Sequence, residues 1–439
     1  MGSYVPSTKK DKQLMLESIG ASSIEELYDI IPNEIILDEE LNIPKGLSEL
    51  EVRKKMSEIA SKNVVFKSIF RGCGAYNHYI PSIVKHVTSK EEFVTAYTPY
   101  QAEISQGILQ SIFEYQTLIC ELTGMDVSNA SVYDGMTAAA EAVLMCLERK
   151  KRKILISKTV NPQIIETIKT YCIGIDCEIV LVPSNNGKTD LEQLEKLMDK
   201  EVSSVLVQQP NYYGQIEDCT AIGKIAKQYK GYYIISSNPI SLGLYKTPRE
   251  YGADVAVGEG QPLGLPLSFG GPYLGFMATT DKNVRRLPGR IAGETTDGDG
   301  NRAFVLTLQA REQHIRREKA SSNICSNQAL CAMTASVYLS SMGERGLEQV
   351  ANLCMSKAHY LAERLCELPD FKLLYDGEFF HEFVTRSKGN AYKMMEGLEE
   401  YGILGGYPIN DRDIIWCATE NNSKEDIDEL IDVLKGVEV

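Results

Sequence analysis

Three glycine-rich or polar segments stand at the expected loop ends of a sheet, where ligands bind in open α/β folds. They span residues 129–137, 235–238 and 258–272. The first leads into an expected helix, whose free N–H groups suit a phosphate. The candidate phosphate contacts are Ser131, Asp134, Gly135 and Thr137. A simple N-cap is the alternative. The third segment is not a dinucleotide fingerprint, because Leu263 stands where G-x-G-x-x-G requires a glycine.

Two further segments gather hydrogen-bonding side chains. The candidates are Tyr76, Asn77 and His78 in residues 71–81, and Tyr97, Thr98, Tyr100 and Gln101 in residues 97–101. Tyrosine and asparagine donate hydrogen bonds at neutral pH, so they suit contacts to a carboxylate or a phosphate. Gly72 and Gly74 permit close approach of the backbone. Packing at an interface is the alternative for the tyrosines, and a general acid or base role for His78 is a weaker hypothesis.

Short apolar runs alternate with helical patterns from about residue 100 onward. The runs are KILIS (153–157), CEIVLVP (177–183), SSVLVQQ (203–209), YYIISS (232–237), ADVAVG (253–258) and YLGFMAT (273–279). Such strands predict an α/β fold with a mostly parallel sheet, covered on both faces by helices. Residues 105–124 have a helical period that ends at Gly124, and a second helix is expected after Gly135.

The chain is long enough to form more than one core, and its pattern predicts three parts. Residues 1–60 form an expected helical arm, in which Ser23 and Glu26 make a capping box for a helix over residues 24–31. The large α/β domain follows over residues 61–325. A long helix over 326–366 and the runs FKLLYD, EFVTR and DIIWCAT then predict a smaller α+β domain over residues 326–439.

Composition excludes several classes of function. The formal net charge of −14 disfavours nucleic acid and anionic membranes as partners. No run approaches 18 apolar residues, and the first residues lack the apolar core of a signal peptide. The 11 cysteines are dispersed without a C-x-x-C pair, which disfavours a zinc or redox site. We therefore expect a cytoplasmic protein without a metal.

Two other features have ordinary interpretations. Residues 297–300 (Asp-Gly-Asp-Gly) lack the later carboxylates of a calcium loop, so a hairpin turn is favoured. Several basic side chains are concentrated in residues 285–319. They are Arg285, Arg286, Arg290, Arg311, Arg316, Arg317 and Lys319. Internal ion pairs are the preferred interpretation of this group, and docking of an acidic carrier protein is the alternative.

The order of the first three segments resembles the large domain of fold-type I pyridoxal-phosphate (PLP) enzymes. A closer resemblance is to the glycine decarboxylase family, the P-protein of the glycine cleavage system. The length of the chain matches the α subunit of its split, two-gene form. The segments that carry this resemblance are 97–107, 121–124, 129–131 with 134–135, 258–261, 287–290 and 306–313.

The resemblance also reveals a departure from the PLP pattern. A fold-type I enzyme uses a lysine after the strand ADVAV to form the Schiff base with its cofactor. Aligning GQPLGLP (260–266) with the family's lysine-bearing stretch puts Gln261 at the lysine position. An amide cannot form an imine. The acid that pairs with the pyridine nitrogen would fall near Asn238, which cannot stabilise a protonated ring as a carboxylate does.

The resemblance therefore implies a subunit that helps to build a glycine decarboxylase site without holding the cofactor. PLP would be bound by a homologous β subunit (glycine dehydrogenase subunit 2), and the lipoyl group of H-protein would accept the aminomethyl group. An α2β2 assembly is expected, with this chain lining the shared site. Two alternatives stay open: a non-catalytic scaffold descended from a PLP enzyme, and a stand-alone PLP lyase or transaminase that uses Lys246.

Overall fold

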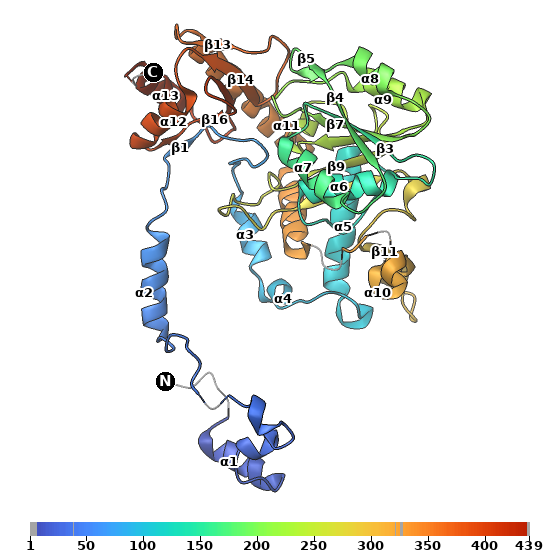
Figure 1. The fold of residues 1–439 in the computed structure, drawn as a ribbon, viewed down its shortest axis with the longest axis vertical. Helices are drawn as coiled ribbons and strands as arrows, with labels where there is room; N and C mark the ends of the chain where they lie inside the picture. Colours follow the sequence, from blue (N-terminus) through green and yellow to red (C-terminus); the bar gives the residue numbers. More distant parts are fainter. Residues whose placement is uncertain (1–6, 38, 321, 325–327, 437–439) are drawn as a thin grey trace. The chain divides into compact units, whose positions relative to one another are not determined.

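The structure is a computed structural model and describes residues 7–37, 39–320, 322–324 and 328–436. It divides into a unit of residues Met1–Val64 and a unit of residues Val65–Val439 (Figure 1). The absence of a signal peptide was inferred from residues 1–13, of which the first six lie outside the described part. The division into three domains at residues 60 and 325 stays a prediction.

The first unit consists of short helices without a core of its own. Helix α1 (Lys9–Ser18) begins at a capping box of Thr8, and α2 (Glu49–Ala60) begins at one of Ser48. None of the described residues before 65 is buried. The expected helix over 24–31 was wrong in extent, since the structure has only a 3-10 turn, Glu25–Tyr28. The carboxylate of Glu26 bonds to the serine at position 22, so the expected capping box from position 23 does not form.

A seven-stranded sheet is the centre of the second unit, with strand order β2-β10-β9-β8-β7-β3-β4. The strands are β2 (Val127–Ser128), β3 (Lys153–Ser157), β4 (Glu178–Val182), β7 (Val202–Gln209), β8 (Tyr232–Ser237), β9 (Val255–Glu259) and β10 (Gly275–Thr279). Five neighbouring strands of this sheet run parallel, and they are β4, β3, β7, β8 and β9. Strand β10 is antiparallel to both β9 and β2, so the sheet is mostly parallel, as the apolar runs predicted.

Helices cover both faces of this sheet (Figure 1). On one face, α6 (Gly135–Cys146) and α7 (Pro162–Tyr171) pack against inward residues such as Ile154, Leu206 and Ile234. On the other face, α5 (Gln106–Thr123), α8 (Leu191–Leu197) and α9 (Cys219–Gln228) pack against Leu155, Val205 and their neighbours. Because successive side chains of a strand point to opposite faces, a continuous apolar run produces two cores.

The C-terminal part has a four-stranded antiparallel sheet in the order β13-β14-β17-β16. Its strands are β13 (Phe371–Leu373), β14 (Glu382–Ser387), β16 (Tyr407–Pro408) and β17 (Asp413–Cys417), packed with α12 (Ala391–Glu400) and α13 (Lys424–Gly436). The long helix α11 (Ala329–Cys366) is interrupted at Gly343, whose φ of 62° is not helical. The expected start of this helix, at 326–327, lies outside the described residues.

A short strand from early in the chain joins this C-terminal part. Strand β1 (Ser68–Ile69) pairs in parallel with β15 (Ile403–Leu404), and Phe70 is buried in the C-terminal core. The chain then enters the loop of residues 71–81 before it reaches the large sheet. Among the described residues, no helix has the length and apolarity needed to cross a membrane.

Candidate functional site

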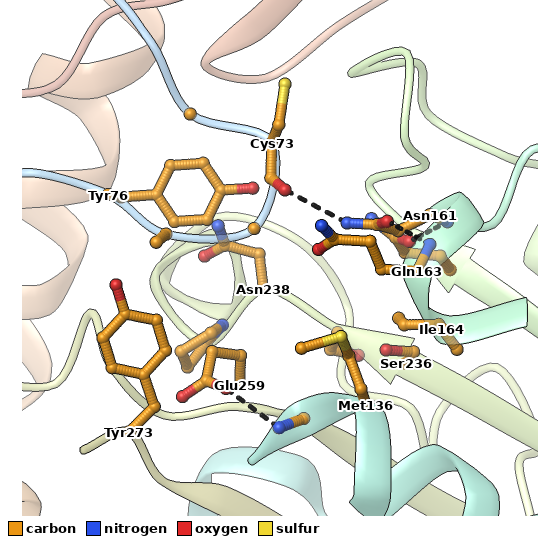
Figure 2. A pocket seen from close by; sticks show the side chains of 17 residues that line it. Cys73, Tyr76, Met136, Asn161, Gln163, Ile164, Ser236, Asn238, Glu259 and Tyr273 are labelled. Atoms are coloured by element: carbon orange, nitrogen blue, oxygen red, sulfur yellow. Dashed lines mark hydrogen bonds between the residues drawn. The ribbon is translucent and has the colours of Figure 1, made fainter. Parts of the chain in front are cut away.

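A pocket of about 180 Å³ lies at the carboxyl ends of the parallel strands (Figure 2). It is lined by residues 72–76, by the starts of α6 and α7, and by the ends of β7, β8 and β9. Among the candidate residues, Tyr76, Gly135 and Asn238 line it. The hydroxyl of Ser237, another lining residue, is buried and has no hydrogen-bond partner in the described part of the chain. The fold thus brings the three loop-end segments together with a fourth from far upstream.

The start of α6 is occupied by side chains of the chain itself. Asp134 is the N-cap, and its carboxylate accepts a hydrogen bond from the N–H of Thr137 at 2.8 Å. The N–H of Gly135 is bonded to the carboxylate of Glu259 at 2.9 Å. Ser131 lies away from the pocket, where its hydroxyl accepts from the N–H of Gln328 at 3.0 Å. The four candidate phosphate contacts are therefore engaged within the protein.

Gln261 is buried and does not line the pocket. Its amide oxygen accepts from the N–H of Tyr76 at 2.8 Å, and its amide nitrogen donates to the carbonyl of Tyr76 at 2.9 Å. The same nitrogen donates to the carbonyl of Leu265 at 2.7 Å. This side chain holds the loop of residues 71–81 to the loop that follows β9.

Asn238 lies at the end of β8 and faces the pocket (Figure 2). Its side-chain oxygen accepts from the N–H of Ile240 at 2.9 Å, and its nitrogen lies 3.3 Å from Nε2 of His381. Burial lowers the pKa of His381 well below its usual value, and His78 lowers it further. Position 238 therefore carries a neutral amide beside an imidazole that is kept neutral.

Tyr76 contacts a buried carboxylate that the sequence did not indicate. Its hydroxyl donates to Glu382 at 2.8 Å, and the N–H of Cys73 donates to the same carboxylate at 2.6 Å. Burial raises the pKa of Glu382 to about 7, against the two hydrogen bonds that lower it. Gly72 gives the room for this contact, because a Cβ there would lie 2.4 Å from the Glu382 carboxylate.

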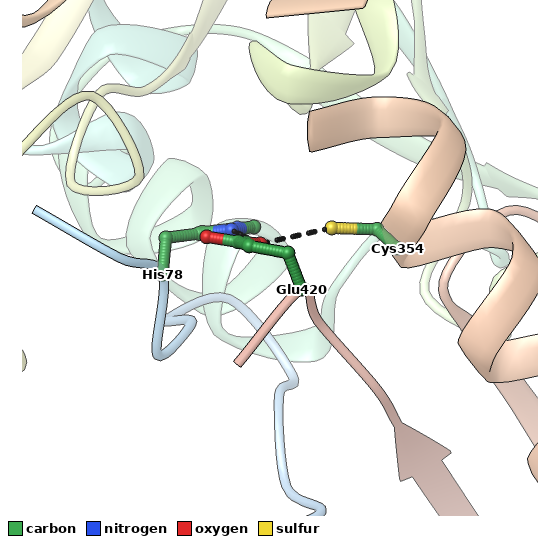
Figure 3. A group of neighbouring side chains, drawn as sticks. All are labelled: His78, Cys354 and Glu420. Carbon is green, nitrogen blue, oxygen red and sulfur yellow. Dashed lines mark hydrogen bonds and ion pairs between the residues drawn. The ribbon is translucent and has the colours of Figure 1, made fainter. Parts of the chain in front are cut away.

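His78 belongs to a separate buried triad with Glu420 and Cys354 (Figure 3). Nδ1 of His78 lies 2.8 Å from a carboxylate oxygen of Glu420, and the Cys354 thiol donates to the same oxygen at 3.2 Å. The N–H of Tyr79 donates to the other oxygen at 2.6 Å. Although burial raises the pKa of Glu420, His78 and these donors bring it below its usual value. The triad anchors the loop of residues 71–81, and neighbouring Asn77 binds Thr419 through its carbonyl at 2.8 Å.

The second group of candidates is on the surface. Tyr97 is 87% exposed, and its hydroxyl has no partner among the residues that the structure describes. Tyr100 is 53% exposed, and its hydroxyl accepts from Arg290 at 2.9 Å while the guanidinium lies 5.2 Å from the ring centre. Thr98 is partly buried and Gln101 is exposed. None of these four residues lines the pocket, whereas Tyr76 lines it and Asn77 and His78 follow Tyr76 in the same loop.

The lining residues do not fit pyridoxal phosphate. Among the described residues, no lysine, arginine or histidine lines the pocket, and Glu259 contributes a carboxylate at the start of α6. Lys246 is exposed and is not a lining residue. An imine-forming amine, an acid for the ring nitrogen and free N–H groups for the phosphate are therefore not provided together.

The remaining features of the sequence have structural roles. Residues 297–301 form the turn of the hairpin β11 (Ile291–Thr296) and β12 (Arg302–Thr307), as the sequence predicted. The Asp297 carboxylate accepts from the N–H of Asn301 at 2.8 Å within this turn. In the basic group, the expected internal ion pairs are not what Arg286 and Arg311 form. Arg286 donates to the hydroxyl of Tyr232, and Arg311 donates to the carbonyl of Gly289, which are both neutral groups. Docking of an acidic carrier there stays a prediction.

Comparison with known proteins gives one family for the whole chain. The family model described as "Glycine cleavage system P-protein" matches residues 2–434. A relative from Moorella thermoacetica, named "Probable glycine dehydrogenase (decarboxylating) subunit 1", is 51% identical over 99% of each chain. A relative of the same name from Desulfitobacterium hafniense is 49% identical over 98% of each chain.

Solved structures agree on the fold. A crystal structure of glycine decarboxylase (P-protein) of the glycine cleavage system, in inhibitor-bound form, superimposes with a TM-score of 0.95 at 39% identity. It covers 100% of both chains. Glutamate decarboxylase from Lactobacillus brevis has a TM-score of 0.68 at 14% identity and covers 95% of this chain and 96% of its own. At 14% identity, this second likeness shows only that the chain has the fold of PLP-dependent enzymes.

Proposed function

The chain belongs to the glycine cleavage system P-protein family, and we propose that it is the α subunit of a heteromeric glycine decarboxylase. In this assembly a homologous β subunit (glycine dehydrogenase subunit 2) holds pyridoxal phosphate, and the lipoyl group of H-protein receives the aminomethyl group. The expected stoichiometry is α2β2. A cytoplasmic location stays a prediction from the dispersed cysteines.

The observation that carries this proposal is that position 261 holds a buried glutamine in place of an amine. The Gln261 amide is buried and bonded to the main chain of Tyr76, so it neither reaches the pocket nor offers an amine. Pyridoxal phosphate, when bound, supplies the electron sink for loss of carbon dioxide from glycine. Since the pocket of this chain does not fit that group, the activity of the family requires a second chain.

The exposed tyrosines are the groups of this chain that we expect to act at the shared site. Tyr97 and Tyr100 project from the surface in a segment that bears the family resemblance. Arg290 orients Tyr100 through a hydrogen bond and by packing against its ring. In the complex, their hydroxyl groups would hold and orient the carboxylate of glycine or the cofactor of the partner.

Exchange of labelled bicarbonate into glycine tests the proposal, because it measures decarboxylation without the later steps. Each subunit alone is expected to be inactive, and the mixture active. Borohydride reduction of the active mixture, followed by peptide mapping, should place the pyridoxyl group only on a lysine of the partner. Exchange by this chain alone, or a pyridoxyl group on Lys246, would contradict the proposal.

A further inference from the structure

We propose that the carboxylate of Glu259 takes the place of a bound phosphate at the start of α6, so that the pocket of this chain excludes phosphate-bearing ligands. Glu259 thereby determines the specificity of the pocket, separately from the missing lysine at position 261. This property belongs to the chain itself and holds with or without a partner subunit.

Three main-chain donors from three segments hold the Glu259 carboxylate. One oxygen accepts from Gly135 at 2.9 Å, and the other accepts from Gln261 at 2.9 Å and from Leu274 at 3.0 Å. Convergent N–H groups of this kind are what proteins present to an oxyanion. Gly135 is the first residue of a 12-residue helix, whose N-terminus carries a partial positive charge. The donors expected for a ligand are thus directed at a side chain of the protein.

The local backbone is shaped to bring Glu259 to the helix. A Cβ on Gly135 would lie 2.7 Å from the backbone nitrogen of Glu259 and 2.9 Å from its Cα. Glycine at the first helical position therefore lets the end of β9 approach the start of α6 (Figure 2). On the strand side, a Cβ on Gly258 would lie 2.3 Å from the carbonyl oxygen of Ser237. Gly135 therefore permits the contact between α6 and β9, and Gly258 permits the close packing of β9 against β8.

Charge around the helix start opposes a further anion. The Asp134 carboxylate caps the same turn by accepting from Thr137, so two carboxylates share one helix N-terminus. Burial, together with a smaller effect of the nearby Asp134, raises the pKa of Glu259 to about 7, although the three N–H groups that bond to this carboxyl group lower its pKa. A phosphate carries about −1.5 to −2 charges at neutral pH. It would meet these carboxylates in a pocket whose described lining contains no cationic side chain.

Titration of the full-length chain with inorganic phosphate tests the proposal. Calorimetry at constant ionic strength gives the dissociation constant for the wild type and for Glu259→Ala. The substitution frees three N–H groups and removes the carboxyl group that occupies them, so phosphate should bind the variant at least about tenfold more tightly than the wild type. Glu400→Ala is the matched control, because it removes a carboxylate from the exposed end of α12. It should bind phosphate as the wild type does.

A folded Glu259→Ala variant that binds phosphate no more tightly than the wild type would overturn the proposal. Circular dichroism establishes whether the variant is folded. If it is not, Glu259→Gln decides the question, because it keeps the shape, removes the charge and leaves a single acceptor oxygen. Its phosphate affinity should rise at least about threefold, and an affinity equal to that of the wild type would overturn the proposal. Both outcomes are independent of glycine exchange, so they leave the proposed function untouched.

Discussion

The side-chain amide of Gln261 forms hydrogen bonds in both directions with the main chain of Tyr76, which lies 185 residues away in the sequence. The neutral amide provides one acceptor oxygen and two N–H donors in one planar group, which matches the three hydrogen bonds that Gln261 makes. A lysine could donate to the two carbonyls but could not accept from the N–H of Tyr76. Gln261 therefore contributes to the stability of the loop that closes the pocket.

Gln261→Lys should destabilise the chain without restoring a cofactor. The substitution leaves the N–H of Tyr76 without an acceptor and buries a charge, at a cost of roughly 2–5 kcal/mol in the free energy of unfolding. Urea denaturation provides the measurement. Gln228→Lys, on the exposed face of α9, is the matched control and should change stability by less than about 0.5 kcal/mol. Equal stability of the two variants would show that the contacts of Gln261 contribute little.

Glu382 should make stability depend on pH. The pKa of its carboxyl is about 7 in the folded chain and 4.5 when unperturbed, so the folded state binds the proton more tightly. The stability that this group contributes is full below pH 4.5 and is lost as the pH rises through 7. Glu382→Gln cannot titrate, so between pH 5 and pH 8 it should gain roughly 2–3 kcal/mol relative to the wild type. Urea denaturation across this range measures the difference.

Glu400→Gln is the control for the loss of a carboxylate, since this side chain is exposed at the end of α12. Parallel pH profiles for the wild type and Glu382→Gln would mean that the buried carboxyl does not hold its proton.

Tyr97→Phe should lower glycine–bicarbonate exchange while assembly survives. Its hydroxyl has no partner within the described chain, so the substitution reports only on contacts to another molecule. Removing a hydroxyl that contacts a charged group costs about 1.5–3 kcal/mol, or roughly 10- to 150-fold in rate. Tyr100→Phe should also lower the exchange rate, and the loss of its hydrogen bond to Arg290 should lower it further.

Tyr392→Phe serves as the control, because this tyrosine is 48% exposed on α12, away from the candidate segment. It should exchange at the wild-type rate. If the Tyr97 and Tyr100 variants also assemble and exchange normally, the segment is only interface packing.

The first unit should matter for assembly rather than for the fold of the chain. Ile30 is 92% exposed, and none of the described residues before 65 is buried, so the apolar side chains of this arm need a surface outside the arm to cover them. We expect the β subunit to supply that surface. Ile30→Asp should weaken the complex with the β subunit at least about tenfold. Sedimentation of the mixed subunits gives the affinity. Asn33→Asp is the control, because it adds the same charge without removing apolar area. An equal loss of affinity for the β subunit in that variant would show that the added charge, and not the lost apolar contact, weakens the complex.

The strands and helices of the large sheet could be predicted because continuous apolar runs and helical periods are local signals. The run over 253–258 predicted β9, and Gly124 marked the end of α5. For the site, the sequence predicted which loops come together, but it did not predict the contacts between their residues. Nothing local indicates that Glu259 bonds to Gly135, because 124 residues separate them. The glycines on both sides of Glu259 were the available signal of a close approach.

The buried partners of the loop over 71–81 were missed for the same reason. Glu382 and Glu420 lie in the C-terminal part, more than 300 residues from Tyr76 and His78. In the sequence each is an ordinary carboxylate among many. Their roles follow from the path of the chain, which crosses the C-terminal layer at β1 before it forms the loop.

The contacts of Gln261 and Glu259 limit which residues positions 261 and 259 can accept. A lysine at 261 alone would leave a buried N–H without a partner, and a small residue at 259 alone would expose three N–H groups that now share one carboxylate. Each of these substitutions alone should lower stability. Selection for a stable fold is therefore enough to keep glutamine at 261 and glutamate at 259, whether or not either residue takes part in a reaction.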